Sequence, residues 1–213
     1  MSTVHLYLPV RPGTPDVEEV LRYMGMRGSA PEDVRELAQR AIAGLPAQPR
    51  ACYKRIPAEV PDEEHVRLDG ELIPSRSLAR HLAGCTAAYL MAVTVGADVD
   101  RQISRYERFS PAMALAADAA GSAAVEVLAD ELNEYLAEVE AACGNMLRSR
   151  YSPGYGDFPL DYQEPMLRSL EAGKRLGMSL SEGLMLLPVK SVTAVIGVYR
   201  APEPQEGARE GDE

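Results

Sequence analysis

Apolar positions in the first 45 residues repeat at the spacing of an α-helix. Between positions 16 and 24 they fall on one side of a helix, and a second amphipathic stretch begins at Glu32 and ends at Gly44. Ser29 and Glu32 are three residues apart, which is the spacing of a capping box. We therefore predict two short helices, with Ser29 opening the second.

The pattern then changes to one typical of β-strands. Residues 51–56 form a plausible strand, and residues 65–73 contain two short arms around Asp69-Gly70. An Asp-Gly pair tolerates the positive φ angles of a tight turn, so the second segment predicts a hairpin. Residues 89–95 (YLMAVTV) are almost wholly apolar, which indicates a strand buried on both faces.

The rest of the chain alternates mostly between helices and connecting loops. Ser75 is a candidate cap for a short helix that stops at Gly84. Further helices are predicted at 98–107, 111–142 and 161–175, and two final strands at 185–187 and 189–199. In the longest helix, Gly121-Ser122 indicates either close helix packing or backbone exposed to a ligand.

This mixture of elements predicts an α+β fold with a mainly antiparallel, twisted sheet flanked by helices. We divide the chain into an N-terminal helical and hairpin region (1–84), a core (85–200) and an acidic tail (201–213). The tail is rich in acids, prolines and glycines and cannot pack, so we expect it to be disordered.

Composition and charge narrow the possible partners. Of the 213 residues, 46% are hydrophobic and 25% charged, which is ordinary for a globular protein. A net charge of −10 argues against nucleic acid or an anionic membrane as a partner. Residues 3–10 are too short for a signal peptide, and no apolar stretch approaches the roughly 20 residues needed to cross a bilayer. We therefore expect a soluble, cytoplasmic protein.

Cysteine and histidine spacing gives no sign of a metal site. Cys52, Cys85 and Cys143 are far apart and form no CxxC pair, and the three histidines have no ligand spacing. We expect the cysteines to be small buried apolar residues in a reducing compartment, and no protein-held metal. His81 is expected to be a packing residue.

The segment from Arg150 to Pro159 (RYSPGYGDFP) is the strongest candidate for chemistry. Pro153 fixes one φ angle, and Gly154 permits a positive φ or the close approach of a ligand. Arg150 can bind a carboxylate with two parallel hydrogen bonds, and Tyr155 offers a flat ring and a hydroxyl. The alternative is an ordinary proline-rich surface loop, and the loop alone does not decide between the two.

Four motifs, in order and at matching spacing, resemble the reactivation domain of cobalamin-dependent methionine synthase. Residues 150–155 resemble that family's R-x-A-P-G-Y-P pattern, and residues 128–136 resemble the helix that carries an acidic ligand contact. The other two are 177–182 (GMSLSE) and 188–192 (PVKSV). The resemblance covers about 121–197, so the core is expected to be like the reactivation domain, while residues 23–28 (YMGMRG) resemble short, free-standing relatives.

The resemblance implies a site for S-adenosylmethionine (AdoMet). Arg150 would bind the AdoMet carboxylate, and Asp130 would accept from its ammonium group. Backbone groups at Ser152 and Gly154 would bond the adenine edge. Tyr155 would face the sulfonium or the corrin ring. For Arg150 the alternative is a surface ion pair, which the loop match makes the weaker interpretation. For Asp130 the alternative is an acid on the solvated face of its helix, and the two interpretations are balanced.

By the same resemblance, the chain is an accessory subunit for reductive reactivation of methionine synthase. Cobalamin would be held by a partner, a corrinoid-binding methionine synthase subunit without its own reactivation domain. A flavodoxin- or ferredoxin-like protein would supply the electron. No general base is needed, because the protein's task is to position the two reactants. Whether the chain is itself an enzyme stays open; if active, it is part of a split methyltransferase.

Two alternatives follow from departures from the family pattern. The family domain continues past the last strand and returns a tyrosine to the AdoMet site, and an N-terminal aspartate contact has no clear counterpart here. We therefore also consider a non-catalytic docking module that binds a corrinoid protein and has no AdoMet site. A third hypothesis is service to a corrinoid methyltransferase outside methionine synthesis.

Overall fold

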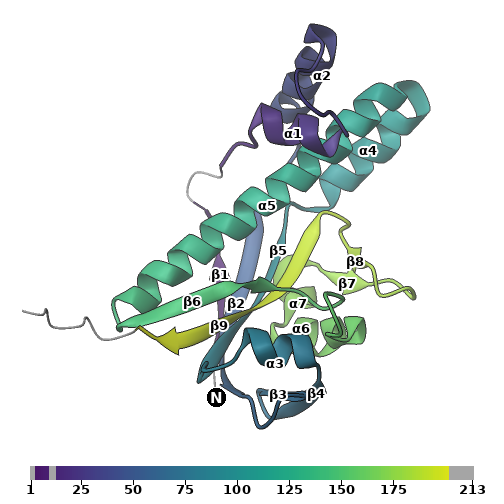
Figure 1. The fold of residues 1–213 in the computed structure, drawn as a ribbon. Coiled ribbons are helices and arrows are strands. Elements are labelled where there is room, and N and C mark those ends of the chain that lie inside the picture. Colours follow the sequence, from purple (N-terminus) through teal and green to yellow (C-terminus); the bar gives the residue numbers. More distant parts are fainter. Residues whose placement is uncertain (1–2, 10–12, 202–213) are drawn as a thin grey trace, which may run out of the picture.

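In a computed structural model, which describes residues 3–9 and 13–201, strands from both ends of the chain build one antiparallel sheet (Figure 1). Its order is β4-β3-β2-β5-β9-β6, and β1 also pairs with β2. The strands are β1 (Val4–Tyr7), β2 (Arg50–Glu59), β3 (His65–Leu68), β4 (Glu71–Pro74), β5 (Ala87–Thr94), β6 (Asn145–Tyr151) and β9 (Ser191–Arg200). The predicted α+β class with an antiparallel sheet is confirmed.

Strand β5 forms the centre of the sheet, and all eight of its residues are buried. It pairs with β2 on one side and with β9 on the other along its whole length. Both faces of β5 are covered, which explains why its sequence is apolar without alternation. The buried strand predicted at 89–95 is therefore confirmed.

Helix α5 (Pro111–Ala141) crosses one face of the sheet diagonally (Figure 1). Leu128, Leu132 and Leu136 point into a core that includes Met91 and Ile196 from the central strands. This single long helix lies where the alanine-rich pattern predicted it.

Helix α5 also corrects one expectation. By length and mean hydropathy it is apolar enough to cross a membrane, contrary to our estimate that no stretch approached that limit. However, 67% of its most apolar 18-residue window is buried inside the protein, as in the core helix of a globular fold.

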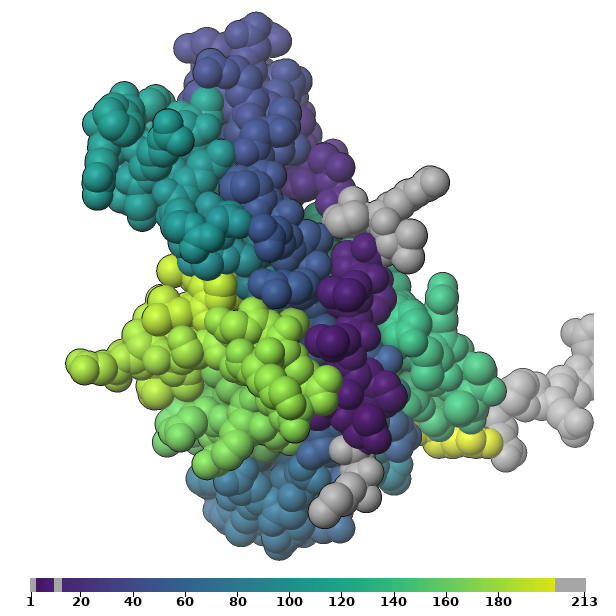
Figure 2. Space-filling model, turned by 180° about the vertical axis from the view of Figure 1, so that it is seen from behind, coloured from purple at the N-terminus to yellow at the C-terminus, as the bar shows by residue number. Residues whose placement is uncertain are grey.

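Shorter helices cover the opposite face, which Figure 2 shows from behind. Phe158, Met166 and Leu170 pack there against the sheet. These elements are α3 (Arg76–His81), the 3₁₀ turn η1 (Leu160–Tyr162), α6 (Gln163–Ser169) and α7 (Ala172–Leu176). The single helix predicted at 161–175 is wrong, because Glu171 adopts a left-handed φ of +50° that separates α6 from α7.

A helical layer stands at one end of the sheet, around the first half of α5 (Figure 1). It contains α1 (Val17–Tyr23), α2 (Glu32–Ala43) and α4 (Ala97–Phe109). A Cβ at Gly121 would lie 2.9 Å from Val99 Cγ1, so this glycine allows close packing of α4 on α5. The capping box at Ser29 is wrong: Pro31 precedes α2, and no side chain caps it.

The short-range turn signals are otherwise confirmed. Asp69 and Gly70 have φ angles of +51° and +87° in the β3–β4 hairpin. Ser75 caps α3 by accepting a hydrogen bond from the Leu78 N–H at 3.1 Å. The predicted strand at 185–187 pairs outside the main sheet, as β8 (Leu186–Leu187) with the unpredicted β7 (Ser179–Leu180).

The regions assigned from the sequence contribute to a common structure. Strand β2 from residues 1–84 pairs with β5 from residues 85–200. Of the tail, residues 202–213 lie outside the described residues.

Cys52 and Cys85 are buried as expected, but the expectation is wrong for Cys143, which is exposed after the end of α5.

Candidate functional site

The end of strand β6 leaves part of the sheet open. Strand β6 pairs with β9 only between Val195 and Arg200, and its register shifts between Leu147 and Arg150. Residues 191–194 of β9 therefore pair with β5 on one side, and no strand within the described ranges pairs with their other side. Ser191 and Val192 are partly exposed, whereas Thr193 and Ala194 are buried. Only the first two residues of this edge therefore offer backbone N–H and C=O groups that a ligand can reach.

Arg150 lies beside this open edge and faces helix α5. Its Nη2 donates to Glu126 Oε2 at 3.0 Å, and its Nη1 lies 2.8 Å from Asp130 Oδ1. The second contact is an ion pair without hydrogen-bond geometry, so the buried Nη1 has no hydrogen-bond partner among the described residues. Asp130 is 67% exposed, whereas Arg150 is only 21% exposed. The arginine therefore retains one donor beside a loosely held carboxylate.

These carboxylates belong to a polar stripe on α5. Asp118, Ser122, Glu126 and Asp130 are spaced four residues apart and so share one face. Buried Lys190, directly before β9, contacts the first half of the stripe, with Nζ 2.7 Å from Asp118 Oδ1 and 3.0 Å from Ser122 Oγ. Sequence reasoning missed Glu126 and Lys190 as neighbours of the site, although Lys190 is part of the PVKSV motif.

The loop after Arg150 is closed by its own backbone hydrogen bonds. The Gly154 N–H donates to the Phe158 carbonyl at 2.8 Å, and the Tyr155 N–H donates to the Ser152 carbonyl at 3.2 Å. Gly154 has a φ of +91°, as its sequence context suggested. Its N–H is thus engaged, while its carbonyl accepts no hydrogen bond from the described residues. Any contact of Gly154 with a ligand would have to use that carbonyl.

Asp157 anchors this loop to helix α3. Its carboxylate accepts from Ser75 Oγ at 2.6 Å and from the backbone N–H groups of Arg76 and Ser77 at 2.8 and 2.9 Å. Hydrogen bonds from the Ser75 and Ser77 side chains hold the pKa of Asp157 well below its usual range. The sequence did not reveal this role, because the partners are about 80 residues away.

Two aromatic side chains complete the loop. Tyr155 is 67% exposed, so its ring is available to a ligand or partner. Tyr151 stacks on His81 with the ring centroids 4.8 Å apart, and His81 Nε2 lies 2.8 Å from the Ser149 carbonyl oxygen. His81 is a packing residue, as expected. Within the described residues, no three His, Cys, Asp or Glu side chains gather as metal ligands.

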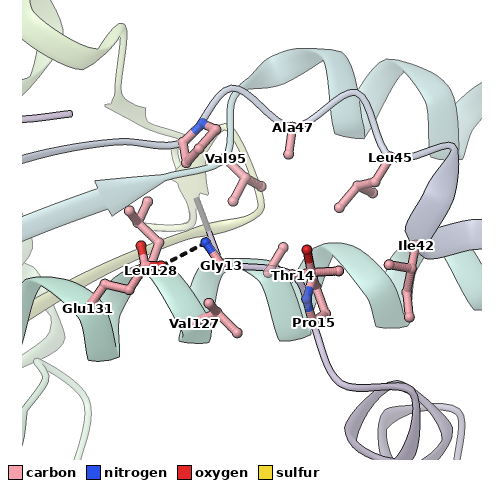
Figure 3. A pocket seen from close by; sticks show the side chains of 12 residues that line it. Gly13, Thr14, Pro15, Ile42, Leu45, Ala47, Val95, Val127, Leu128 and Glu131 are labelled. Atoms are coloured by element: carbon pink, nitrogen blue, oxygen red, sulfur yellow. Dashed lines mark hydrogen bonds between the residues drawn. The ribbon is translucent and has the colours of Figure 1, made fainter. Parts of the chain in front are cut away.

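A small cavity elsewhere on α5 does not suit a ligand of this size. It has a volume of about 160 Å³ and is lined largely by aliphatic side chains, including Ile42, Leu45 and Val127 (Figure 3). Gly13 also lines it, and the Gly13 N–H donates to Glu131 Oε1 at 2.7 Å. Pockets for drug-sized ligands occupy roughly 300–1,000 Å³. The candidate site around Arg150 rests instead on its charged side chains and on the unpaired edge of β9 beside them.

Comparison with known proteins yields a structural match. No protein-family model and no curated protein matches the sequence. A solved structure, the MetH reactivation domain bound to AdoHcy, superposes with a TM-score of 0.63 at 14% identity. The match covers 96% of this chain and 80% of that one. The chain therefore has the fold of the MetH reactivation domain, as the sequence motifs led us to expect.

Proposed function

We propose that this chain, built on the fold of the MetH reactivation domain, is an accessory subunit for the reductive reactivation of cobalamin-dependent methionine synthase. It binds AdoMet and presents the methyl group to a corrinoid held by a partner protein. The observation that carries the proposal concerns Arg150. It lies beside the unpaired edge of β9, and its buried Nη1 has no hydrogen-bond partner among the described residues.

The charges around Arg150 suit the amino-acid end of AdoMet. One guanidinium faces the two carboxylates of Glu126 and Asp130, so the group carries one net negative charge. AdoMet has an ammonium, a carboxylate and a sulfonium, hence one net positive charge. The ligand carboxylate takes the free donor of Arg150, and Asp130 turns from the arginine to the ammonium. Asp130 is the exposed partner of this pair, and exposed pairs stabilise a protein by about 0–1 kcal/mol, so moving the Asp130 carboxylate to the ammonium costs little.

The loop binds the other end of the ligand. The free Gly154 carbonyl accepts from the adenine amino group, and the backbone of Ser152 borders the same edge. Tyr155 places its exposed ring toward the sulfonium or the corrin. AdoMet supplies a methyl group on sulfur, and the acceptor is the cobalt of the partner's corrinoid. The residues of this chain hold and orient the donor, without a general base.

The proposal implies two partners in the cytoplasm. One is a corrinoid-binding methionine synthase subunit, and the other is a flavodoxin- or ferredoxin-like protein that supplies the electron. The solved structure of the same fold was obtained with AdoHcy bound, which supports the ligand class.

Isothermal titration of the purified protein with AdoMet and AdoHcy tests the site. We expect Arg150→Ala to abolish binding while the melting temperature changes by no more than about 2 °C, because the carboxylates of both lost contacts, Glu126 and Asp130, are more than 40% exposed. Arg175→Ala is the matched control, since Arg175 is also ion-paired and is 27% exposed, but it lies on α7. Equal affinity in the wild type and Arg150→Ala would contradict the assignment.

A docking module without an AdoMet site is the second candidate. Exposed apolar side chains favour it: Tyr155 follows Arg150 on the loop, and Met185 and Val189 flank β8. The Gln163 side chain donates to the Leu184 carbonyl at 3.0 Å, which connects the start of α6 to the loop between β7 and β8. If the wild type shows no AdoMet binding yet comigrates with a corrinoid-binding domain, this second function replaces the first.

A further inference from the structure

A hollow of about 620 Å³ lies between helix α3 and edge strand β6. We call it the α3–β6 groove; Tyr199 of β9 also borders it. The side chains from the two walls are Ser77, Arg80, His81, Leu147, Arg148, Ser149 and Tyr151. It is distinct from the site around Arg150, whose guanidinium contacts α5.

The groove gathers positive charge in a chain with a net charge of −10. Neither Arg80 nor Arg148 forms an ion pair with a carboxylate of the described residues. Arg148 Nη2 donates to the Ala83 carbonyl at 3.0 Å, whereas its Nε is buried and has no hydrogen-bond partner within the same ranges. Asp157 contacts the groove at Ser77, and its carboxylate accepts hydrogen bonds from the cap and the first turn of α3. The two arginines therefore outnumber this carboxylate.

Flat groups and a free hydroxyl accompany the two arginines. Arg148 lies over the Tyr199 ring, 4.5 Å from its centroid, and His81 is stacked on Tyr151. In the part of the chain that the structure describes, the Ser149 hydroxyl forms no hydrogen bond. Arginine and hydroxyl donors recognise phosphate oxygens, and planar guanidinium and imidazole groups stack with planar rings.

We infer that the α3–β6 groove binds a phosphate monoester joined to a planar ring, a ligand of the nucleotide class. Arg80 and Arg148 bind the phosphate, and the ring stacks beside His81. The volume of the groove is within the usual range of roughly 300–1,000 Å³ for such ligands. This inference does not depend on the AdoMet site.

Uridine monophosphate (UMP) is the probe, because it lacks the adenine that the Arg150 site would bind. Titration into the ¹⁵N-labelled full chain should shift the amide signals of residues 77–81 and 147–149. Uridine, which lacks the phosphate, and ribose 5-phosphate, which lacks the planar base, should each bind about tenfold more weakly than UMP. We expect Arg80→Gln to weaken UMP binding by about tenfold, since one charge-assisted contact is lost.

Arg105→Gln is the matched control, because Arg105 is also exposed and free of ion pairs with described residues, but lies on α4. It should leave the UMP affinity unchanged. Arg148→Gln should weaken UMP binding by about the same factor as Arg80→Gln. Three results would overturn the inference: no shifts with millimolar UMP, equal weakening by Arg105→Gln, or shifts confined to residues 152–155.

Discussion

At the scale of single residues, Glu140 is the one carboxylate within the described ranges that is fully buried, with 3% exposure. It accepts hydrogen bonds from Arg55 and Tyr89 at 2.7 Å and from Asn145 at 2.6 Å. Burial raises the pKa of Glu140, but these hydrogen bonds outweigh burial and bring the pKa below its usual value. The group joins the end of α5 to β2, β5 and β6.

We expect Glu140→Ala to lower the free energy of unfolding by about 2–3 kcal/mol, because it leaves the buried Tyr89 hydroxyl and the partly exposed Arg55 and Asn145 donors without their acceptor. Urea denaturation at several pH values is the measurement. A lowered folded-state pKa means that the carboxylate stabilises the protein above the unfolded-state pKa of about 4.3 and loses this effect as the pH falls through the folded value. The difference from wild type should be full at pH 7 and shrink below about pH 4. Exposed Glu138→Gln should change little; a pH-independent difference for Glu140→Ala would contradict this role.

At the scale of elements, the loop from 152 to 158 depends on its contact with α3. Gly156 has a φ of +56°, and a Cβ there would lie 2.6 Å from Ser77 Oγ and 2.9 Å from the Tyr151 hydroxyl oxygen. Ser77 also forms hydrogen bonds with Asp157, so Gly156 and Asp157 together hold the loop against α3.

We expect Gly156→Ala to cost about 2–3 kcal/mol of stability and to weaken AdoMet binding, because the added methyl group pushes the loop from α3. Gly28→Ala is the control, since Gly28 also has a positive φ, +83°, but a Cβ there meets nothing within 4 Å. That control should lose only about 1 kcal/mol of stability, which is the cost of an alanine at a positive φ. Thermal melts and titration measure both effects, and equal losses in the two variants would show that the contact with Ser77 is unimportant.

At the scale of the whole molecule, α5 belongs to two cores. Its first half, including Ala116 and Ala120, packs in the helical layer with Val20 and Ala38. Its second half, including Leu132, packs against the sheet. One rigid element therefore connects the two clusters.

We expect unfolding to be a single cooperative transition, because melting either cluster removes the support of α5 from the other. Far-UV circular dichroism weights the helices, whereas near-UV dichroism reports tyrosines such as Tyr53 and Tyr89 beside the sheet. The two melting curves should coincide. Separate midpoints would show that the helical layer and the sheet are independent units.

The sequence by itself determined the elements whose signals are local. The apolar run of β5, the Asp69-Gly70 turn and the alanine-rich α5 each depend on neighbouring residues, and each was predicted where it lies. The four motifs between residues 128 and 192 also indicated the fold, which the superposition on the MetH reactivation domain confirms. The AdoMet roles of the residues stay predictions.

Only the tertiary structure decided what these elements do to one another. It paired Arg150 with Glu126 as well as Asp130, left residues 191–194 of β9 without a strand partner on one side, and bonded Asp157 to α3. It also broke the helix predicted at 161–175 at Glu171. The physical reason is range: a helix or turn depends on residues a few positions apart, whereas strand ends, ion pairs and grooves depend on segments that meet only after the chain has packed.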